Sequence, residues 1–322
     1  MTRFRQIAYR SARWAFFIAS LAYLVVFAQR AMLDTRVSMP DLLRTSAGET
    51  AIAALVFALA AAGSVVGWHA LLQHLAGTRL SRRGIVQVFC TTQIAKYLPG
   101  NVGHHIGRVA LARTQLGVPA VTTTLSLLQE GALVVAAALL VGTACVFVAP
   151  LALPLFAGRS AGPLLLGVLA AGFGTLALVR WQARRIGEAP RWLAWLARAA
   201  PSWPALRVAL PAYVGIHVAN GVAVACIASA TLPIGGSELA LLTGAYALAW
   251  MVGFLLPGAP GGLGVRESAF LMLIAPAWPA DVAFGIAMLA RLANVAADAL
   301  IFVAGLVLAG KSGTEAATPN DL

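Results

Sequence analysis

The sequence of 322 residues is 60% hydrophobic and only 11% charged, and its formal net charge at pH 7 is +12. Soluble domains carry about 25% charged residues, so this composition excludes a soluble enzyme and predicts a polytopic membrane protein. The length allows about seven spans of roughly 20 residues each in one domain. Arginines scattered between apolar runs explain the positive charge by membrane topology and attraction to anionic lipids, and they argue against nucleic-acid binding.

Charge-free apolar runs predict most of the spans. The first run follows a basic segment and has no small-residue cleavage site after it, so we expect an uncleaved span. Tryptophans among arginines at 188–204 predict a short interfacial helix, and the polar residues 312–322 predict a disordered tail after a single domain at 1–311. The predicted spans are 15–28, 51–72, 131–158, 160–179, 208–237, a broken segment at 239–265, and 282–310.

The distribution of arginines predicts the orientation. Arginine-rich segments before the first span, after the second span and at residues 180–207 fall on one side of the membrane. The positive-inside rule makes that side cytoplasmic. We therefore expect a multi-pass protein whose N-terminus and C-terminus are both in the cytoplasm.

Two segments do not fit simple spans. The first, residues 84–113, has apolar arms at 84–95 and 97–107 around Pro99 and Gly100, which break a helix. At 1.5 Å per residue, neither arm crosses a hydrocarbon core of about 30 Å. This pattern predicts a re-entrant hairpin that enters and leaves the membrane on the cytoplasmic side.

The second broken segment, residues 239–279, has its proline- and glycine-rich break at 257–267, and the apolar stretch 268–280 after it is also too short to span. In the predicted topology this hairpin opens to the opposite side. The expected fold is therefore an all-α, polytopic integral membrane helical bundle with two oppositely oriented re-entrant helical hairpins. Interrupted segments in corresponding positions of two halves indicate the substrate site of a transporter.

Lys96 lies beside the first break, where an ammonium at membrane depth requires a partner. Together with the adjacent Gln93 and Tyr97, it is a candidate to bind a lipid phosphate or a carboxylate. The alternative is a lysine that extends to the cytoplasmic interface. His104 and Arg108 share one helix face, and the free N–H groups at the start of this arm suit an anion; the alternative is a polar cytoplasmic edge.

No metal or cofactor site is expected. His104 and His105 are neighbours in the sequence, so their side chains should diverge and form a poor metal pair. The cysteines Cys90, Cys145 and Cys226 lie inside apolar runs without paired spacing, which predicts neither a disulfide nor a metal framework.

Further ionisable residues interrupt the apolar segments. Glu130, Glu267 beside Arg266, and Arg291 and Asp298 in the last span are candidate binding residues, because intramembrane charges are usually functional. The alternative is structural ion pairing, with Arg291 and Asp298 two turns apart on one helix face. The residues of the two breaks are also candidate binding residues: Pro99, Gly100, Gly261, Gly262 and Gly264. The glycines of the second break lack the Gly-Lys-Ser/Thr ending of a phosphate loop.

The two breaks carry a family resemblance. Lys96-Tyr97-Leu98-Pro99-Gly100, with Arg108, Arg113 and the later Glu130, resembles a signature of the lysylphosphatidylglycerol synthase transmembrane-region family. Pro260-Gly261-Gly262-Leu263-Gly264-Val265-Arg266-Glu267 is similar to the second signature of that family. The two motifs occur in the family's order and separation, so the resemblance covers most of the chain.

The resemblance implies a bacterial or archaeal inner-membrane protein that moves or handles lipids. In the best-known members this region precedes a cytosolic domain that aminoacylates phosphatidylglycerol. This chain ends at Leu322, soon after the last predicted span, so we do not expect that synthase activity. The expected partners are membrane lipids, either an anionic phospholipid or a polyprenyl phosphate.

The predicted function is a lipid flippase or lipid-phosphate carrier that works by alternating access. Lys96, Arg108 and Arg266 would bind the anionic head group. Glu130, Glu267 and Asp298 would balance these cations. One alternative is a non-transporting accessory protein that presents lipid to a partner glycosyltransferase or synthase. Another is a membrane-embedded enzyme acting on a head group, although the sequence shows no nucleophile–base pair or metal set for one.

Overall fold

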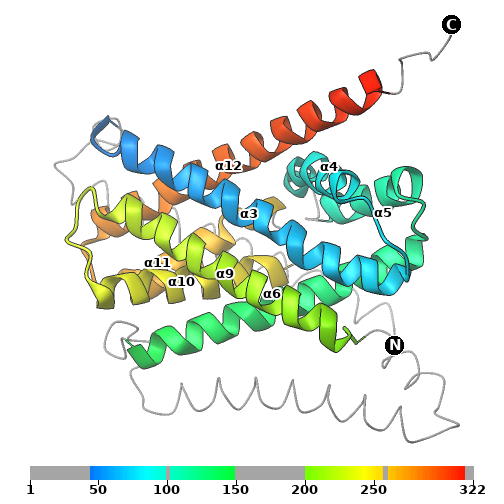
Figure 1. The fold of residues 1–322 in the computed structure, drawn as a ribbon. Helices are drawn as coiled ribbons and strands as arrows, with labels where there is room; N and C mark the ends of the chain where they lie inside the picture. Colours follow the sequence, from blue (N-terminus) through cyan, green and yellow to red (C-terminus); the bar gives the residue numbers. More distant parts are fainter. Residues whose placement is uncertain (1–43, 99–101, 149–199, 257–259, 316–322) are drawn as a thin grey trace, which may run out of the picture.

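The computed structural model describes residues 44–98, 102–148, 200–256 and 260–315. Every regular element in these ranges is a helix (Figure 1). The elements in chain order are α3 (Ala47–Ala76), α4 (Arg82–Thr92), η1 (Gln93–Tyr97), α5 (Gly103–Gln115), α6 (Ala120–Val148), α9 (Trp203–Ala228), α10 (Gly236–Leu255), η3 (Pro260–Gly262), α11 (Val265–Ile274) and α12 (Ala280–Glu315).

Five of the described helices, α3, α6, α9, α10 and α12, are long and apolar enough to cross a membrane. A helix rises 1.5 Å per residue, so about 20 apolar residues cross the hydrocarbon core. The prediction of an all-helical, multi-pass membrane protein is therefore confirmed. The predicted spans at 15–28 and 160–179 lie outside the described residues.

Close contact through small residues holds the long helices together. In lipid, apolar side chains gain little from leaving the solvent, so helices associate through tight packing at small residues. α3 runs along α9 (Figure 1), and Gly67 of α3 lies against the ring of the buried Tyr213. Gly221 of α9 similarly contacts Thr243 of α10, and Gly244 contacts Cys145 of α6. These contacts fix the positions of the helices that surround the site.

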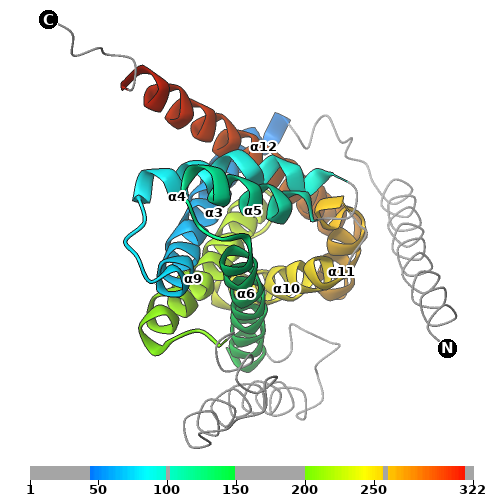
Figure 2. The ribbon, with the colours of Figure 1, turned by 90° about the vertical axis from the view of Figure 1, so that its right-hand side faces the viewer.

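The first break is confirmed as a helix–break–helix unit. α4 ends in the 3₁₀ turn η1, and α5 begins only at Gly103 (Figure 2). Leu98 is extended, with φ −67° and ψ 149°, because a residue before proline is excluded from the helical region. Neither α4 nor α5 is long enough to span a bilayer.

The second break has the same local cause as the first break, but it is shorter than predicted. Leu256 is extended, with φ −87° and ψ 101°, and the next residue is Pro257. After η3, Gly264 with φ 80° precedes α11, which already begins at Val265. Arg266 and Glu267 therefore lie in the first turn of α11, so the predicted extent of the break, 257–267, was too long.

Other predicted boundaries also need correction. α6 begins at Ala120, earlier than the predicted start at residue 131, because Glu130 is accommodated inside the helix by an ion pair. α9 ends at Ala228 and α10 begins at Gly236, so the charge-free run 208–237 contains a turn. Trp203 starts α9, although it was predicted in the interfacial segment 188–204, whose residues before 200 lie outside the description.

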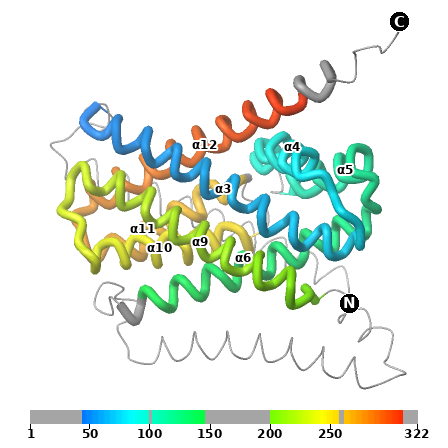
Figure 3. Tube along the Cα trace, in the orientation of Figure 1, coloured from blue at the N-terminus to red at the C-terminus, as the bar shows by residue number. Residues whose placement is uncertain are grey.

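The last helix is longer than the predicted span 282–310. α12 continues to Glu315, into the predicted tail at 312–322, and its C-terminal part projects beyond the bundle (Figure 3). The remaining tail residues lie outside the description.

Candidate functional site

Asp298 of α12 holds the end of the first break. Lys96 Nζ lies 2.7 Å from Asp298 Oδ1 and 2.6 Å from Oδ2, and the Tyr97 hydroxyl donates to Oδ2 at 2.6 Å. The Asp298 side chain is only 3% exposed, against 23% for Lys96. Burying a carboxylate is favourable only when cations and hydrogen-bond donors satisfy it. The lysine and tyrosine of η1 together satisfy Asp298.

Glu267 accepts hydrogen bonds that stabilise the second break. Its Oε2 accepts from the backbone N–H of Gly264 at 2.7 Å, which caps the first turn of α11. Its Oε1 accepts from Arg291 Nη1 at 3.2 Å, and the same nitrogen donates to the carbonyl of Gly261 at 3.1 Å. Arg291 therefore ties α12 to both sides of the glycine-rich turn.

One face of α12 binds both breaks. Arg291, Asn294 and Asp298 are spaced i, i+3 and i+7, so they line one side of the helix. Arg291 contacts the second break, Asn294 contacts Arg266 in the first turn of α11, and Asp298 contacts the first break. The pairing of Arg291 with Asp298 that sequence spacing offered is wrong, because each residue has a different partner. α12 acts as a common support for the two breaks.

Arg108 and Glu130 form a second buried ion pair, between α5 and α6. Arg108 Nη1 lies 2.7 Å from Glu130 Oε2, and their side chains are 4% and 10% exposed. The guanidinium also lies 4.0 Å from the ring centroid of Phe89 and 5.2 Å from that of Trp68. Such a cation is stabilised by both the carboxylate and the aromatic faces.

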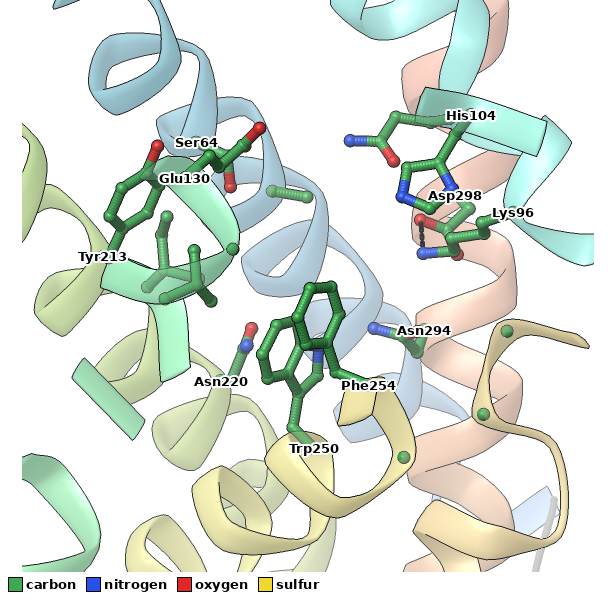
Figure 4. A pocket seen from close by; sticks show the side chains of 18 of the residues that line it. Ser64, Lys96, His104, Glu130, Tyr213, Asn220, Trp250, Phe254, Asn294 and Asp298 are labelled. Atoms are coloured by element: carbon green, nitrogen blue, oxygen red, sulfur yellow. Dashed lines mark hydrogen bonds and ion pairs between the residues drawn. The ribbon is translucent and has the colours of Figure 1, made fainter. Parts of the chain in front are cut away.

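Both ion pairs, Lys96–Asp298 and Arg108–Glu130, line one cavity of about 170 Å³. Figure 4 shows the Lys96–Asp298 pair on one side of it and Glu130 on the other, with Trp250 and Phe254 between them. A water molecule occupies about 30 Å³ of liquid volume, so the cavity has room for several waters or a small polar group. The candidate residues that line it are Gln93, Lys96, His104, Arg108, Glu130, Gly261, Gly262, Arg266 and Asp298.

The other candidates lie outside the wall or outside the description. Tyr97 and Arg291 contact the lining residues Asp298 and Gly261, and Glu267, which caps Gly264, lies behind the lining residue Arg266. Pro99 and Gly100 are not among the described residues.

The two neighbouring histidines lie against each other. The prediction that His104 and His105 diverge is wrong, because their ring centroids are only 3.8 Å apart. Both rings line the cavity, and the Nδ1 atom of each has no hydrogen-bond partner. Within the described ranges, no group of three potential metal ligands occurs.

The two breaks touch each other although more than a hundred residues separate them in the sequence. A Cβ added to Gly261 would lie 2.9 Å from Tyr97 Cε1, so the ring of Tyr97 packs directly on this glycine. The Arg291 guanidinium lies 5.6 Å from the same ring. The two breaks are therefore in direct contact beside the cavity, which Gly261 lines.

Gly261→Ala is expected to disrupt this contact. The backbone φ of Gly261 is +58°. This conformation is unfavourable by about 1–2 kcal/mol for any residue that has a side chain. The new methyl group would also displace Tyr97. Gly117→Ala is the matched control, because Gly117 has φ +67° but nothing within 4 Å of the added atom. Thermal unfolding in detergent should show a clearly larger loss for Gly261→Ala. Equal losses would contradict a role for the Tyr97 contact.

An apolar groove of about 850 Å³ adjoins the cavity. It runs between α5, α6 and the end of α10, and Gly131 and Phe254 line both spaces. Its walls are mostly aliphatic, and Ile106 and Leu128 in them are 65% and 58% exposed. A polar cavity beside an apolar groove suits an amphiphilic ligand.

Several lining residues were not predicted. His217 and Asn220 are polar residues inside the apolar α9, and that position is a usable signal of function. Trp250 and Phe254 are spaced i, i+4 on α10, a spacing that gives no distinction from ordinary packing. Only the fold shows that this aromatic face borders the cavity.

The fold and the site define a multi-pass helical membrane protein with a buried, charged cavity between two helix breaks. The sequence matches the family described as "Lysylphosphatidylglycerol synthase TM region" over residues 6–301. The chain therefore belongs to this family, which confirms the resemblance of its two motifs. Among curated proteins, no sequence matches the chain at a significant level.

Proposed function

We propose that the protein is a non-enzymatic lipid flippase or lipid-phosphate carrier of the bacterial inner membrane. The observation that carries this proposal is that the charged cavity and the apolar groove lie side by side, with Gly131 and Phe254 lining both. A head group fits the first space and a hydrocarbon chain fits the second. A carrier of small soluble ions would have no use for the groove.

The two breaks are proposed to be the tips of re-entrant hairpins of opposite orientation. Backbone that leaves the helical conformation is tolerated at membrane depth only when protein or a wet cavity covers it. The contact between Tyr97 and Gly261 and the polar cavity beside it meet that need for both breaks. The second break would then reach the midplane from the side opposite to the first.

Alternating access would use α12 as the fixed support. The Lys96–Asp298 pair holds the first break, and the bond from Arg291 to the Gly261 carbonyl holds the second. Release of one contact while the other persists would open the cavity to one side only. The head group would cross through the cavity while the chain stays in the groove or the bilayer.

Both termini are proposed to face the cytoplasm, on the evidence of the arginine distribution. Single cysteines at Thr2→Cys and Ser312→Cys, in a chain whose native cysteines are replaced by alanine, allow a direct measurement. A membrane-impermeant maleimide added to intact cells should label neither position. Labelling of either one would reverse the proposal for that terminus.

Reconstitution tests the function. Proteoliposomes that contain only the purified chain should move fluorescent anionic lipids between leaflets, measured by dithionite quenching. Movement that requires an added lipid-modifying enzyme would favour the accessory role instead. A chemically altered lipid recovered from vesicles with the purified chain alone would indicate an enzyme.

A further inference from the structure

Few residues form the boundary between the cavity and the apolar groove. Among the described residues, His105 of α5, Gly131 of α6 and Phe254 of α10 line both spaces. These residues belong to different helices, so the boundary lies where α5, α6 and the end of α10 meet. A group that moves from the groove into the cavity across this boundary must pass them.

The ring of Phe254 lies directly on Gly131. A Cβ added to Gly131 would be 3.3 Å from Cζ and 3.7 Å from Cε1 of Phe254, so even a methyl group would be tight there. Gly131 lies inside the long helix α6, and its φ is not positive, so the backbone does not require a glycine at this position. Glycine inside a helix is less favourable than alanine. The glycine therefore provides space that the Phe254 ring fills.

Phe254 is also stacked on a second aromatic ring. The ring of Trp250, one turn earlier on α10, lies parallel to it, with centroids 5.0 Å apart and planes 11° apart (Figure 4). His217 of α9 meets the Trp250 ring edge-on at 5.2 Å and so helps to place it. No charge takes part in the contacts of Phe254 with Trp250 and Gly131. The ring can therefore leave Gly131 without breaking either ion pair of the cavity.

Phe254 belongs to the last turn of α10, beside the second break. The preceding residue, Gly253, packs against that region: a Cβ there would be 3.6 Å from Gly262 Cα and 3.1 Å from Arg266 Cβ. The carbonyl groups of a terminal helical turn lack their partners within the helix. The ring is therefore carried by the part of α10 that can adjust its conformation most easily.

We infer that Phe254 is a gate between the groove and the cavity. With its ring on Gly131 the boundary is closed, and rotation of the ring away from Gly131 lets a lipid head group enter the cavity while the hydrocarbon chain stays in the groove. This inference rests on the proposed lipid-handling function and identifies the route of entry. The occupant is a membrane lipid, because the groove is apolar and lies among helices long enough to cross a bilayer.

Entry into the cavity can be measured with a cysteine at Ser64, which lines the cavity but not the groove. Ser64→Cys is placed in the full chain with its native cysteines replaced by alanine, and the protein is reconstituted in proteoliposomes. The probe is dodecylmaleimide, whose chain holds it in the bilayer. Phe254→Ala should accelerate its reaction about fivefold to tenfold, because no aromatic contact has to break before the reagent enters. N-methylmaleimide, which has no such chain, should be accelerated less.

Gly131→Val changes the same boundary in the opposite direction. The valine would fill the space at the boundary and press on the Phe254 ring. It should slow both the dodecylmaleimide reaction and lipid transfer between leaflets, each by about tenfold, with transfer measured in chains that lack Ser64→Cys. Adding Phe254→Ala removes the opposing ring, so the double variant should regain most of both rates. If Gly131→Val does not fold, Gly131→Ala takes its place.

Two matched controls lie outside both spaces. Leu239→Ala shortens an exposed side chain at the start of α10. Gly215→Val adds a side chain to a glycine of α9 that has nothing within 4 Å of the added Cβ. Both should leave the labelling of Ser64→Cys and lipid transfer unchanged. Acceleration by Leu239→Ala as large as that by Phe254→Ala would overturn the inference.

The labelling and transfer measurements fail independently. A dodecylmaleimide reaction that neither Phe254→Ala nor a folded Gly131→Val changes would overturn the gate, and transfer by the same chains would leave the proposed function intact. Equal acceleration of both maleimides by Phe254→Ala would also overturn the gate, because the ring would then not separate the groove from the cavity. Labelling that follows the size of the side chains at both positions, without lipid transfer by the parent chain, would support the gate and overturn the proposed transfer.

Discussion

Lys96→Ala is expected to abolish lipid transfer while the protein still inserts and folds. The Lys96 ammonium contacts both oxygens of Asp298 and lines the cavity, so its loss removes the cation that joins the first break to α12. Asp298 keeps only the Tyr97 hydroxyl among the donors described here. A buried carboxylate without its cation is destabilising, by a few kcal/mol in comparable sites. Transfer in proteoliposomes and thermal unfolding must therefore be measured together.

Two controls separate function from stability. Lys311→Ala removes the other lysine of the sequence and should leave transfer unchanged. Lys96→Ala combined with Asp298→Asn removes both charges, so it should recover much of the lost stability without recovering transfer. Full transfer by a folded Lys96→Ala protein would show that the lysine has no role with the head group.

The positions of both breaks could be predicted from the sequence because their causes are local. Pro99 follows Leu98 and Pro257 follows Leu256, and a residue before proline is excluded from the helical region. The preceding residue in each case is extended as this rule requires. Long apolar runs likewise predicted long helices, because apolar length is the physical requirement for a span.

The ends of the spans were predicted less well, because a lack of charge does not define a helix. Glu130 was taken to interrupt a span, yet it lies inside α6, where Arg108 neutralises it. Residues 208–237 contain no charge, yet the chain turns between α9 and α10. An ion pair sets the boundary in the first case and a turn sets it in the second. Neither is visible in the hydropathy pattern.

The partners of the charged residues could not be predicted, because they come from distant parts of the chain. Arg291 and Asp298 share a helix face, but the nearest opposite charges belong to α11 and η1 respectively. Sequence spacing describes contacts along one helix. Sequence spacing contains no information on which break is folded against that helix. In this structure both breaks are folded against α12.

The shared support of the two breaks has a mechanical consequence. Arg291 and Asp298 stand two turns apart on one rigid helix, so the breaks are held at a fixed separation while both contacts persist. Loss of either contact would release one break from α12 and leave the other attached. Coupling between the two would then pass through the Tyr97–Gly261 contact.

Arg108→Ala is expected to cause the largest loss of stability among single substitutions in the site. The guanidinium is paired with Glu130 and packed against the rings of Phe89 and Trp68, so its removal leaves a buried carboxylate and an empty space. Removing one partner of a buried ion pair costs about 3–5 kcal/mol. Thermal or denaturant unfolding of the purified chain in detergent measures this loss.

A double-mutant cycle identifies the source of that loss. Arg113→Ala on the same helix removes an exposed arginine and should change stability by less than about 0.5 kcal/mol. Glu130→Gln in the Arg108→Ala background removes the unpaired charge, so the double variant should be more stable than Arg108→Ala alone. Recovery would be incomplete, because the contacts of the guanidinium with the aromatic rings are not restored. If the double variant is instead less stable by the full sum of the two single changes, the pair does not couple α5 to α6 and the arginine stabilises the fold through its aromatic contacts alone.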